Sequence, residues 1–307
     1  MEENIYTEDS CGLSFAWRRE KGKITVTRCI SCGEKAVLPG LLDSEPVAAI
    51  GEYAFSGRRE LAEIVLPSGL KSIGRHAFYN CRRLESVSLP AGAADVRDGA
   101  FKNCEGLHRV YFRLDRTGEL CMKNILYDLE QDIQCGILDE GRDGKQEERI
   151  RLVFPKNTYE YVANDAARIF HEVAYGSGYY YRQCVSERDM DYGRYDELFD
   201  YASREERSGV VTWLAFCRLA YPYRLSKKAA GRYLGWIREH IEELVGMMIE
   251  KDDYEAAGRL IACEGLDSQD AGRIVHAARE RGSAEYTGFF LAGRRERFGS
   301  AVRSFEL

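Results

Sequence analysis

The sequence has 307 residues, of which 45% are apolar and 31% are charged, and its formal net charge is −6. A chain of this length is expected to form two domains, each large enough to bury its own core. The acidic balance gives no reason to expect a nucleic-acid or acidic-lipid partner, so we predict neither nucleic-acid nor membrane binding.

Two features of the sequence indicate a soluble cytoplasmic protein. Residues 1–10 are acidic and polar, and they contain neither the basic nor the apolar region of a signal peptide. The longest apolar run, residues 210–221, is interrupted by Arg218 and is far shorter than the ~20 residues that a bilayer requires. We therefore expect a cytoplasmic location and no transmembrane segment.

Residues 12–28 have the pattern of a β-hairpin. Leu13, Phe15 and Trp17 occupy alternate positions, residues 20–22 have turn composition, and the alternation resumes in the second arm. We expect this hairpin to cover the open apolar end and the unpaired strand edge of the structure that follows.

Three copies of one pattern follow the hairpin with a period of 23 residues. Each copy contains an Ala-Phe pair, a leucine at a fixed offset and a strand motif. The marker positions are Phe55, Phe78 and Phe101, then Leu61, Leu84 and Leu107, then residues 64–67, 87–90 and 110–113. Fixed self-similarity of this length marks a solenoid. Residues 36–39 match the strand motif as a divergent first copy, so we predict a short solenoid of about four strands.

Alternation along each strand decides which side chains face the core of the solenoid. Ile64 and Leu66 and their equivalents are predicted to point inward, the three phenylalanines to stack as a ladder, and Asn80 and Asn103 to take left-handed corners. The outward positions form the candidate partner-binding face. They are Glu63 and Val65, Ser86 and Ser88, and Arg109 and Tyr111, with Lys35 and Val37 in the first copy.

The repeats resemble a known class of protein. The runs Val37-Leu38-Pro39, Pro46 to Phe55 and Leu61 to Pro67 are similar to the BspA-like class of bacterial leucine-rich repeats. The resemblance covers roughly residues 24–112, about a third of the chain. It implies a leucine-rich-repeat solenoid and a role in macromolecular recognition, and the best-known members of the class are surface proteins.

The repeat pattern ends before residue 113, and the rest of the chain is predicted to form a β cap and then helices. Residues 125–127, 133–138 and 150–154 have strand character and complete a first domain over residues 1–155. After Pro155 the apolar spacing becomes helical, with Val162, Ala166, Ile169, Phe170 and Val173 on one helix face. The fold class is therefore predicted as α+β, with an all-α helical domain over residues 156–307.

Several further helices are predicted in this second domain. Residues 210–221 form a buried helix, and residues 226–250 form a long helical stretch that is broken near Glu239. Three short helices are predicted to start near Asp252, Asp267 and Ser283, with Gly265 and Gly282 as stop signals. Their similar lengths suggest ankyrin-like stacked helices at residues 252–298.

The motifs that could carry catalysis or bind metal are incomplete. Cys29-x-x-Cys32 is the only paired cysteine spacing and lacks a second Cys or His pair, so we interpret it as reduced structural thiols rather than as a zinc or redox site. His171-Glu172 begins an H-E-x-x-H motif, but Tyr175 occupies the position of the second metal ligand. We therefore expect no cofactor, no metal and no enzyme activity.

One cluster of aromatic residues has two interpretations. It consists of Tyr175, Tyr179, Tyr180, Tyr181 and Arg182. Tyrosines beside an arginine can form a recognition surface, here for a small ligand or a glycan. They can also form a docking seam between the two predicted domains, with buried rings and hydroxyls at the edge. We favour the seam.

The main functional hypothesis is a non-catalytic module or scaffold that binds another protein, of unknown identity, through the outward strand face. The alternative is small-ligand or glycan binding at the tyrosine cluster. A third hypothesis, an enzyme in the helical half, would require His171 or His240 to be paired with a carboxylate in a cleft.

Overall fold

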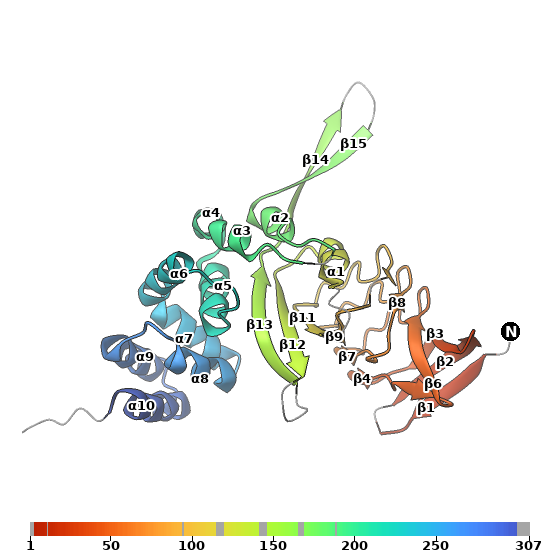
Figure 1. Cartoon of the computed structure of the whole chain (residues 1–307), viewed down its shortest axis with the longest axis horizontal. Helices are drawn as coiled ribbons and strands as arrows, with labels where there is room; N and C mark the ends of the chain where they lie inside the picture. The colour runs from red at the N-terminus through yellow and green to blue at the C-terminus, as the bar shows by residue number, and fades with distance from the viewer. Residues whose placement is uncertain are drawn as a thin grey trace, which may run out of the picture. The chain divides into compact units, whose positions relative to one another are not determined.

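A computed structural model describes residues 3–10, 12–93, 95–114, 120–140, 146–164, 169–187 and 189–299 (Figure 1). The chain divides into two compact units, with the boundary between Tyr201 and Ala202. Residues 156–201, which we expected in the helical domain, thus form part of the first unit. The predicted fold class is confirmed, because a β-solenoid of a few turns is followed by a set of helices.

One side of the solenoid is a seven-stranded sheet. Its strands are β1 (Asn4–Glu8), β2 (Leu13–Glu20), β3 (Lys23–Ser31), β5 (Leu41–Leu42), β6 (Glu45–Ile50), β8 (Ser72–Ile73) and β10 (Asp95–Val96). Strands β2 and β3 form the predicted hairpin, and β3, β6, β8 and β10 then pair in parallel. Lys21 and Gly22 supply the positive φ angles of the hairpin turn. The hairpin therefore starts the parallel stack, as expected.

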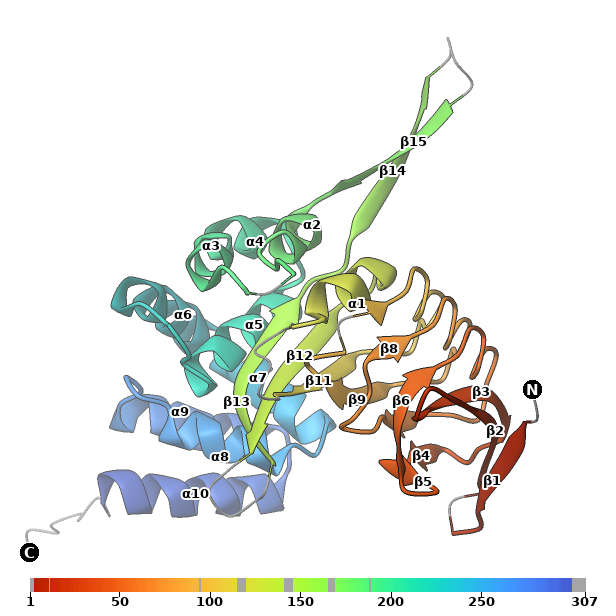
Figure 2. The ribbon, with the colours of Figure 1, turned by 45° about the vertical axis from the view of Figure 1, so that its right-hand side comes forward.

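The other side is a six-stranded sheet. Its strands are β4 (Lys35–Val37), β7 (Glu63–Val65), β9 (Ser86–Pro90), β11 (Arg109–Arg113), β12 (Ile133–Glu140) and β13 (Gln146–Phe154). The first five strands pair in parallel, and β13 pairs with β12 in antiparallel orientation. Figure 2 shows the strands of successive coils side by side. The predicted β cap at the end of the repeats is confirmed for β12 and β13.

The core between the two sheets contains the predicted phenylalanine ladder. The ring of Phe78 lies 5.2 Å from that of Phe55 and 5.0 Å from that of Phe101, and all three rings are buried. Asn80 and Asn103 take left-handed conformations at φ 61° and 62°, as expected for corner residues. The 23-residue period therefore brings equivalent side chains directly onto one another.

Residues 125–127 form part of a helix, not the predicted strand. Helix α1 (Met122–Asp128) buries Met122, Ile125 and Leu126, and this spacing of three and then one residue matches a helix face. The short apolar run Ile125-Leu126-Tyr127 is compatible with either structure when read alone.

The prediction of a helix over residues 162–173 is also wrong. Strands β14 (Thr158–Asn164) and β15 (Ile169–Tyr175) form an antiparallel hairpin that extends away from the solenoid (Figure 2). The segment is rich in β-branched and aromatic residues, which favour strands. Three short helices follow, α2 (Ser177–Arg182), α3 (Tyr192–Glu197) and α4 (Phe199–Glu205).

The second unit is helical. Its helices are α5 (Ser208–Ala220), α6 (Lys227–Glu239), α7 (Ile241–Glu250), α8 (Tyr254–Ala262), α9 (Ser268–Glu280) and α10 (Ala284–Phe298). Asp253, Asp267 and Ser283 cap the last three helices with side-chain hydrogen bonds, at the predicted starts. The break after Glu239 is also confirmed. In the described part of the chain, every helix is too short or too polar to span a bilayer.

Candidate functional site

The structure brings the six predicted contact residues together on one face of the six-stranded sheet, which we call the strand face. The register aligns Glu63, Ser86 and Arg109 in one row across β7, β9 and β11. It aligns Val65, Ser88 and Tyr111 in the next row. Because the 23-residue period repeats the same outward positions, each row combines residues that are far apart in sequence.

Neighbouring strands extend both rows. In β4, Lys35 pairs with Glu63 and Val37 pairs with Val65. Val37 is 52% exposed, although it is a large apolar residue on a sheet. Together with the half-buried Val65 and Tyr111, it gives the second row a partly apolar character.

Charged pairs border the apolar row. The ammonium of Lys35 lies 3.0 Å from the carboxylate of Glu63, and a guanidinium nitrogen of Arg109 lies 3.7 Å from that of Glu85. All four side chains are substantially exposed. Exposed pairs of this kind contribute about 0–1 kcal/mol to the free energy of unfolding.

Arg113 is part of the same face, and the sequence interpretation missed it. Its Nη1 atom donates a hydrogen bond to the hydroxyl of Ser88 at 2.6 Å, and its Nη2 atom donates to the carbonyl of Leu66. Burial lowers the pKa of Arg113 below its ordinary value. The register places Arg113 beside Pro90. The sequence did contain a signal for this residue, because Arg113 stands where the strand motif of the preceding copy has Pro90. Ser88 thus has a hydrogen bond within the sheet and is less free for a partner than expected.

Tyr111 packs over the next strand. A β-carbon built on Gly136 of β12 would lie 2.7 Å from Cδ1 of Tyr111 and 2.5 Å from Oε1 of Glu148. The glycine therefore leaves the space into which the tyrosine ring fits. Glu148, which also approaches Gly136, forms a buried ion pair with Arg151 of β13. Within the first unit, the β4 end of the strand face is more open than the β12 end.

The tyrosine cluster divides into buried and exposed members. Tyr181 and Arg182 are buried, whereas Tyr175 and Tyr180 are 45% and 40% exposed. Tyr179 is half-buried and contacts Tyr180, with ring centroids 5.5 Å apart. The five residues therefore do not form one continuous surface.

Arg182 joins α2 to the end of the solenoid. Its guanidinium donates to backbone carbonyls of five residues from three segments, Leu126, Leu129, Gln131, Pro155 and Gly178. The ring of Tyr181 packs edge-on against Tyr195 at 4.6 Å. These contacts fill the junction between α2 and the end of the solenoid, which lies within the first unit and not between the two units.

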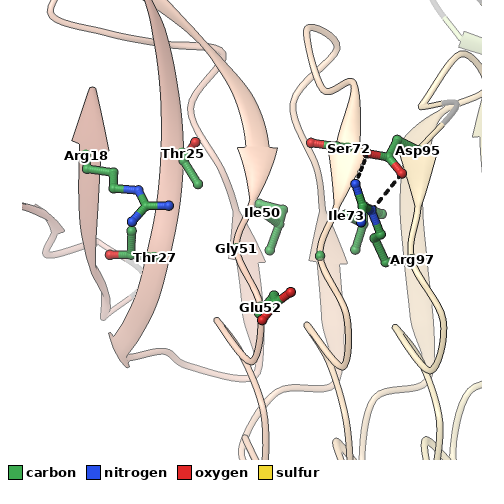
Figure 3. A pocket seen from close by; sticks show the side chains of 11 residues that line it. Arg18, Thr25, Thr27, Ile50, Gly51, Glu52, Ser72, Ile73, Asp95 and Arg97 are labelled. Atoms are coloured by element: carbon green, nitrogen blue, oxygen red, sulfur yellow. Dashed lines mark hydrogen bonds and ion pairs between the residues drawn. The ribbon is translucent and has the colours of Figure 1, made fainter. Parts of the chain in front are cut away.

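A trough of about 500 Å³ lies on the outer face of the other sheet (Figure 3). Its lining includes Gly51 and Gly74, together with the longer side chains of Arg18, Thr27 and Arg97. A β-carbon on Gly74 would lie 2.6 Å from the backbone nitrogen of Glu52, so close stacking of the coils requires this glycine.

The two arginines of the trough are paired with carboxylates within the sheet. Arg97 makes two hydrogen bonds to Asp95, at 3.0 and 3.3 Å, and Arg18 lies 2.9 Å from the carboxylate of Glu20. Its lining also lacks an aromatic ring. The trough therefore has neither the unpaired positive charge of a phosphate site nor the stacking surface of many sugar sites.

The histidines do not assemble a catalytic pair in the described residues. His240 lies 2.9 Å from the carbonyl of Trp236 through Nδ1 and stacks on its indole ring at 4.1 Å. The side chain of His171 lies outside the described residues. Within the described ranges, no group of three or more His, Cys, Asp or Glu residues is placed to hold a metal ion.

Residues 42–131 match, in six copies, the protein family described as "BspA type Leucine rich repeat region". A search of the curated proteins gives no match. Three of the solved structures that match are similar to about a third of this chain. A leucine-rich repeat protein of T. pallidum is 29% identical, with a TM-score of 0.31, and the match covers 34% of this chain and 52% of that protein.

The other two structures give similar values. A leucine-rich cell surface protein of Faecalibacterium prausnitzii is 22% identical, with a TM-score of 0.30 and coverage of 35% of this chain and 30% of that one. A leucine-rich repeat protein of Bacteroides capillosus is 26% identical, with a TM-score of 0.30 and coverage of 34% and 84%. This chain thus spans about half of the first of the three proteins and under a third of the second.

Proposed function

We propose that this chain, in which residues 42–131 are a BspA-type leucine-rich repeat region, is a non-catalytic protein-interaction module. It binds a partner protein through the strand face, with the apolar row of Val37, Val65 and Tyr111 at the centre of the contact. The single observation that carries the proposal is the alignment of this row alongside the row that contains the exposed charged pairs.

The arrangement matches the anatomy of protein interfaces. Interfaces combine an apolar centre, in which tyrosine and arginine are enriched, with a polar rim. Here Tyr111 and Val65 supply the centre, while Lys35, Glu63 and Arg109 supply the rim. Solenoids present such residues on a regular extended surface, because each coil repeats the same outward positions.

The experiment uses the full chain as bait in a lysate of the source cell. Wild type is compared with Val65→Asp, which places a charge in the centre of the apolar row, and with Arg97→Ala in the trough as the matched control. We expect a defined protein to be retained by wild type and the control and to be lost from Val65→Asp. Equal retention of every captured protein by all three baits would contradict the assignment of the strand face.

A further inference from the structure

We infer that the partner of the strand face contributes an extended segment, which pairs with the edge of β4 as an added parallel strand of the six-stranded sheet. The inference rests on the proposed strand-face function and narrows it to one class of partner segment. In this segment an acidic residue stands two positions before an apolar residue, and both side chains lie on the outward face.

Strand β4 is the last strand of its sheet. The order of the sheet is β13, β12, β11, β9, β7 and β4, so β4 pairs with a strand on one side only. The other sheet does not end at the same coil, because β2 and β1 continue it beyond β3 in antiparallel orientation. The N-terminal hairpin thus extends one sheet and leaves the other with an edge at β4.

The hydrogen bonds between β4 and β7 show which backbone groups point to this edge. The carbonyl of Glu34 accepts a bond from β7 at 2.8 Å, and the backbone nitrogen of Leu38 donates to β7 at 3.0 Å. Because backbone groups alternate between the two sides of a strand, those of Lys35 and Val37 point away from β7. Within the described residues, no protein group pairs with these two N–H and two C=O groups.

The opposite edge of the sheet is blocked. At β13 the hydroxyl of Tyr195 accepts a hydrogen bond from the backbone nitrogen of Val153 at 3.0 Å and donates one to the carbonyl of Val153 at 2.6 Å. Tyr195 is buried, so an added strand cannot reach these groups. Unpaired strand edges are templates for pairing with another chain. In the described part of the chain β4 has no such cap, and it is therefore the edge that a partner strand can use.

The side chains of β4 determine what the added strand must present. Residues at equivalent positions of neighbouring strands lie side by side, so an added strand continues both rows of the strand face. In the first row, the exposed ammonium of Lys35 has the carboxylate of Glu63 at 3.0 Å on its β7 side. An acidic residue of the partner provides a second carboxylate on the other side. In the second row, an apolar residue of the partner covers the exposed Val37.

Strand β7 provides a sequence that is compatible with β4. In the parallel register Glu63 lies beside Lys35, and Val65 lies beside Val37. A partner strand with the same acidic and apolar positions, in the same direction, places equivalent side chains on the other side of β4. The edge lysine also disfavours segments without an acidic residue, because charged edge residues oppose nonspecific strand pairing.

The probe for the test is a fluorescein-labelled peptide with the sequence of residues 60–68, mixed with the full-length chain. We expect saturable binding by fluorescence anisotropy and slower amide hydrogen exchange at residues 35–37. The same peptide with Glu63→Lys should bind about fivefold more weakly or less tightly still. Absence of binding, equal binding of both peptides, or unchanged amide exchange at residues 35–37 would overturn the inference.

Two variants of the full-length chain test the edge itself. Val37→Pro removes an N–H group that β7 does not use, and an edge strand tolerates proline at such a position. We expect it to bind the peptide about tenfold more weakly, while Arg97→Ala in the trough binds like wild type. Lys35→Glu, which keeps the backbone donors, should instead prefer the Glu63→Lys peptide. A Val37→Pro chain with its circular dichroism spectrum and peptide affinity unchanged, or an unaltered preference of Lys35→Glu, would contradict the added strand.

The partner captured by the full chain separates this inference from the strand-face function. Loss of that partner from both Val65→Asp and Val37→Pro supports both proposals. Loss from Val65→Asp alone retains the strand face and overturns the added strand. Loss from Val37→Pro alone retains the added strand and overturns the apolar row as the centre of the contact. Retention by both variants contradicts both proposals.

Discussion

The carboxylate of Asp128 accepts a hydrogen bond from the backbone nitrogen of Phe101 at 3.0 Å. In earlier coils the equivalent nitrogen donates to a carbonyl of the next coil, as Phe78 does to Ala100 at 2.8 Å. Asp128 also accepts a bond from Gly99 at 3.1 Å. One side chain at the end of α1 therefore replaces the backbone acceptors of a coil that the chain does not continue.

Removal of this cap should destabilise the solenoid. Asp128→Ala leaves two backbone donors without acceptors, and each buried unsatisfied donor costs about 1–3 kcal/mol. We expect the free energy of unfolding of the first cooperative transition to fall by about 2–4 kcal/mol, measured by chemical denaturation. Asp98→Ala, an exposed acidic residue nearby, should change it by less than about 0.5 kcal/mol. Equal effects of the two substitutions would show that Asp128 does not act as a cap.

The same residue should give the solenoid a pH-dependent stability. Burial, opposed by the two hydrogen bonds, raises the pKa of Asp128 above its ordinary value of 3.8. The folded state therefore binds more protons than the unfolded state between 3.8 and the raised pKa, and this contribution to stability is lost as the pH rises through that window. As the pH rises through this window, wild type should lose stability relative to Asp128→Asn. Thermal unfolding of both proteins at several pH values measures the difference. Parallel profiles would contradict the raised pKa.

Arg182 should be essential for the attachment of α2 to the solenoid. Its guanidinium donates hydrogen bonds to five carbonyls, and the ammonium of lysine cannot reproduce that planar set of donors. We expect Arg182→Lys to lower the free energy of unfolding by about 2–4 kcal/mol. The exposed Arg194→Lys, also in the first unit, is the control. A neutral Arg182→Lys would show that the seam is held by its aromatic contacts instead.

The phenylalanine ladder should be the most sensitive part of the core. Phe78 stacks on both Phe55 and Phe101, so Phe78→Ala removes two ring contacts and leaves a cavity. We expect a loss of about 3–5 kcal/mol in the free energy of unfolding. Tyr53→Ala, in the same repeats but 54% exposed, should cost less than about 1 kcal/mol by the same assay. A Phe78→Ala protein as stable as wild type would mean that the ladder contributes little.

The repeat pattern explains why so much of the solenoid could be predicted from the sequence. A 23-residue period repeats inward, outward and corner positions together, so three copies confirm one another. The strand face followed from this alternation. The trough, on the outward positions of the other sheet, could have been found from residues 51, 72, 74, 95 and 97 in the same way. The charged residues on this surface did not suggest a ligand, so it was not considered as a candidate site.

Elements outside the repeat could not be predicted as well. Residues 158–175 have apolar positions compatible with both a helix and a hairpin, and a single copy does not decide between them. The roles of Asp128, Arg113 and Arg182 depend on contacts with backbone groups far away in the sequence. No local pattern marks such contacts, although Arg113 stands at the position of the motif proline, which was a visible signal. The hydrogen bonds themselves were visible only in the folded chain.

The most direct test of the strand-face account is the affinity of the captured partner for purified full-length variants. We expect Arg109→Ala with Tyr111→Ala to weaken binding by at least about 30-fold, which corresponds to about 2 kcal/mol. The control Arg97→Ala in the trough should bind like wild type. Unchanged affinity of the Arg109 and Tyr111 double variant, with its fold retained by circular dichroism, would contradict the account.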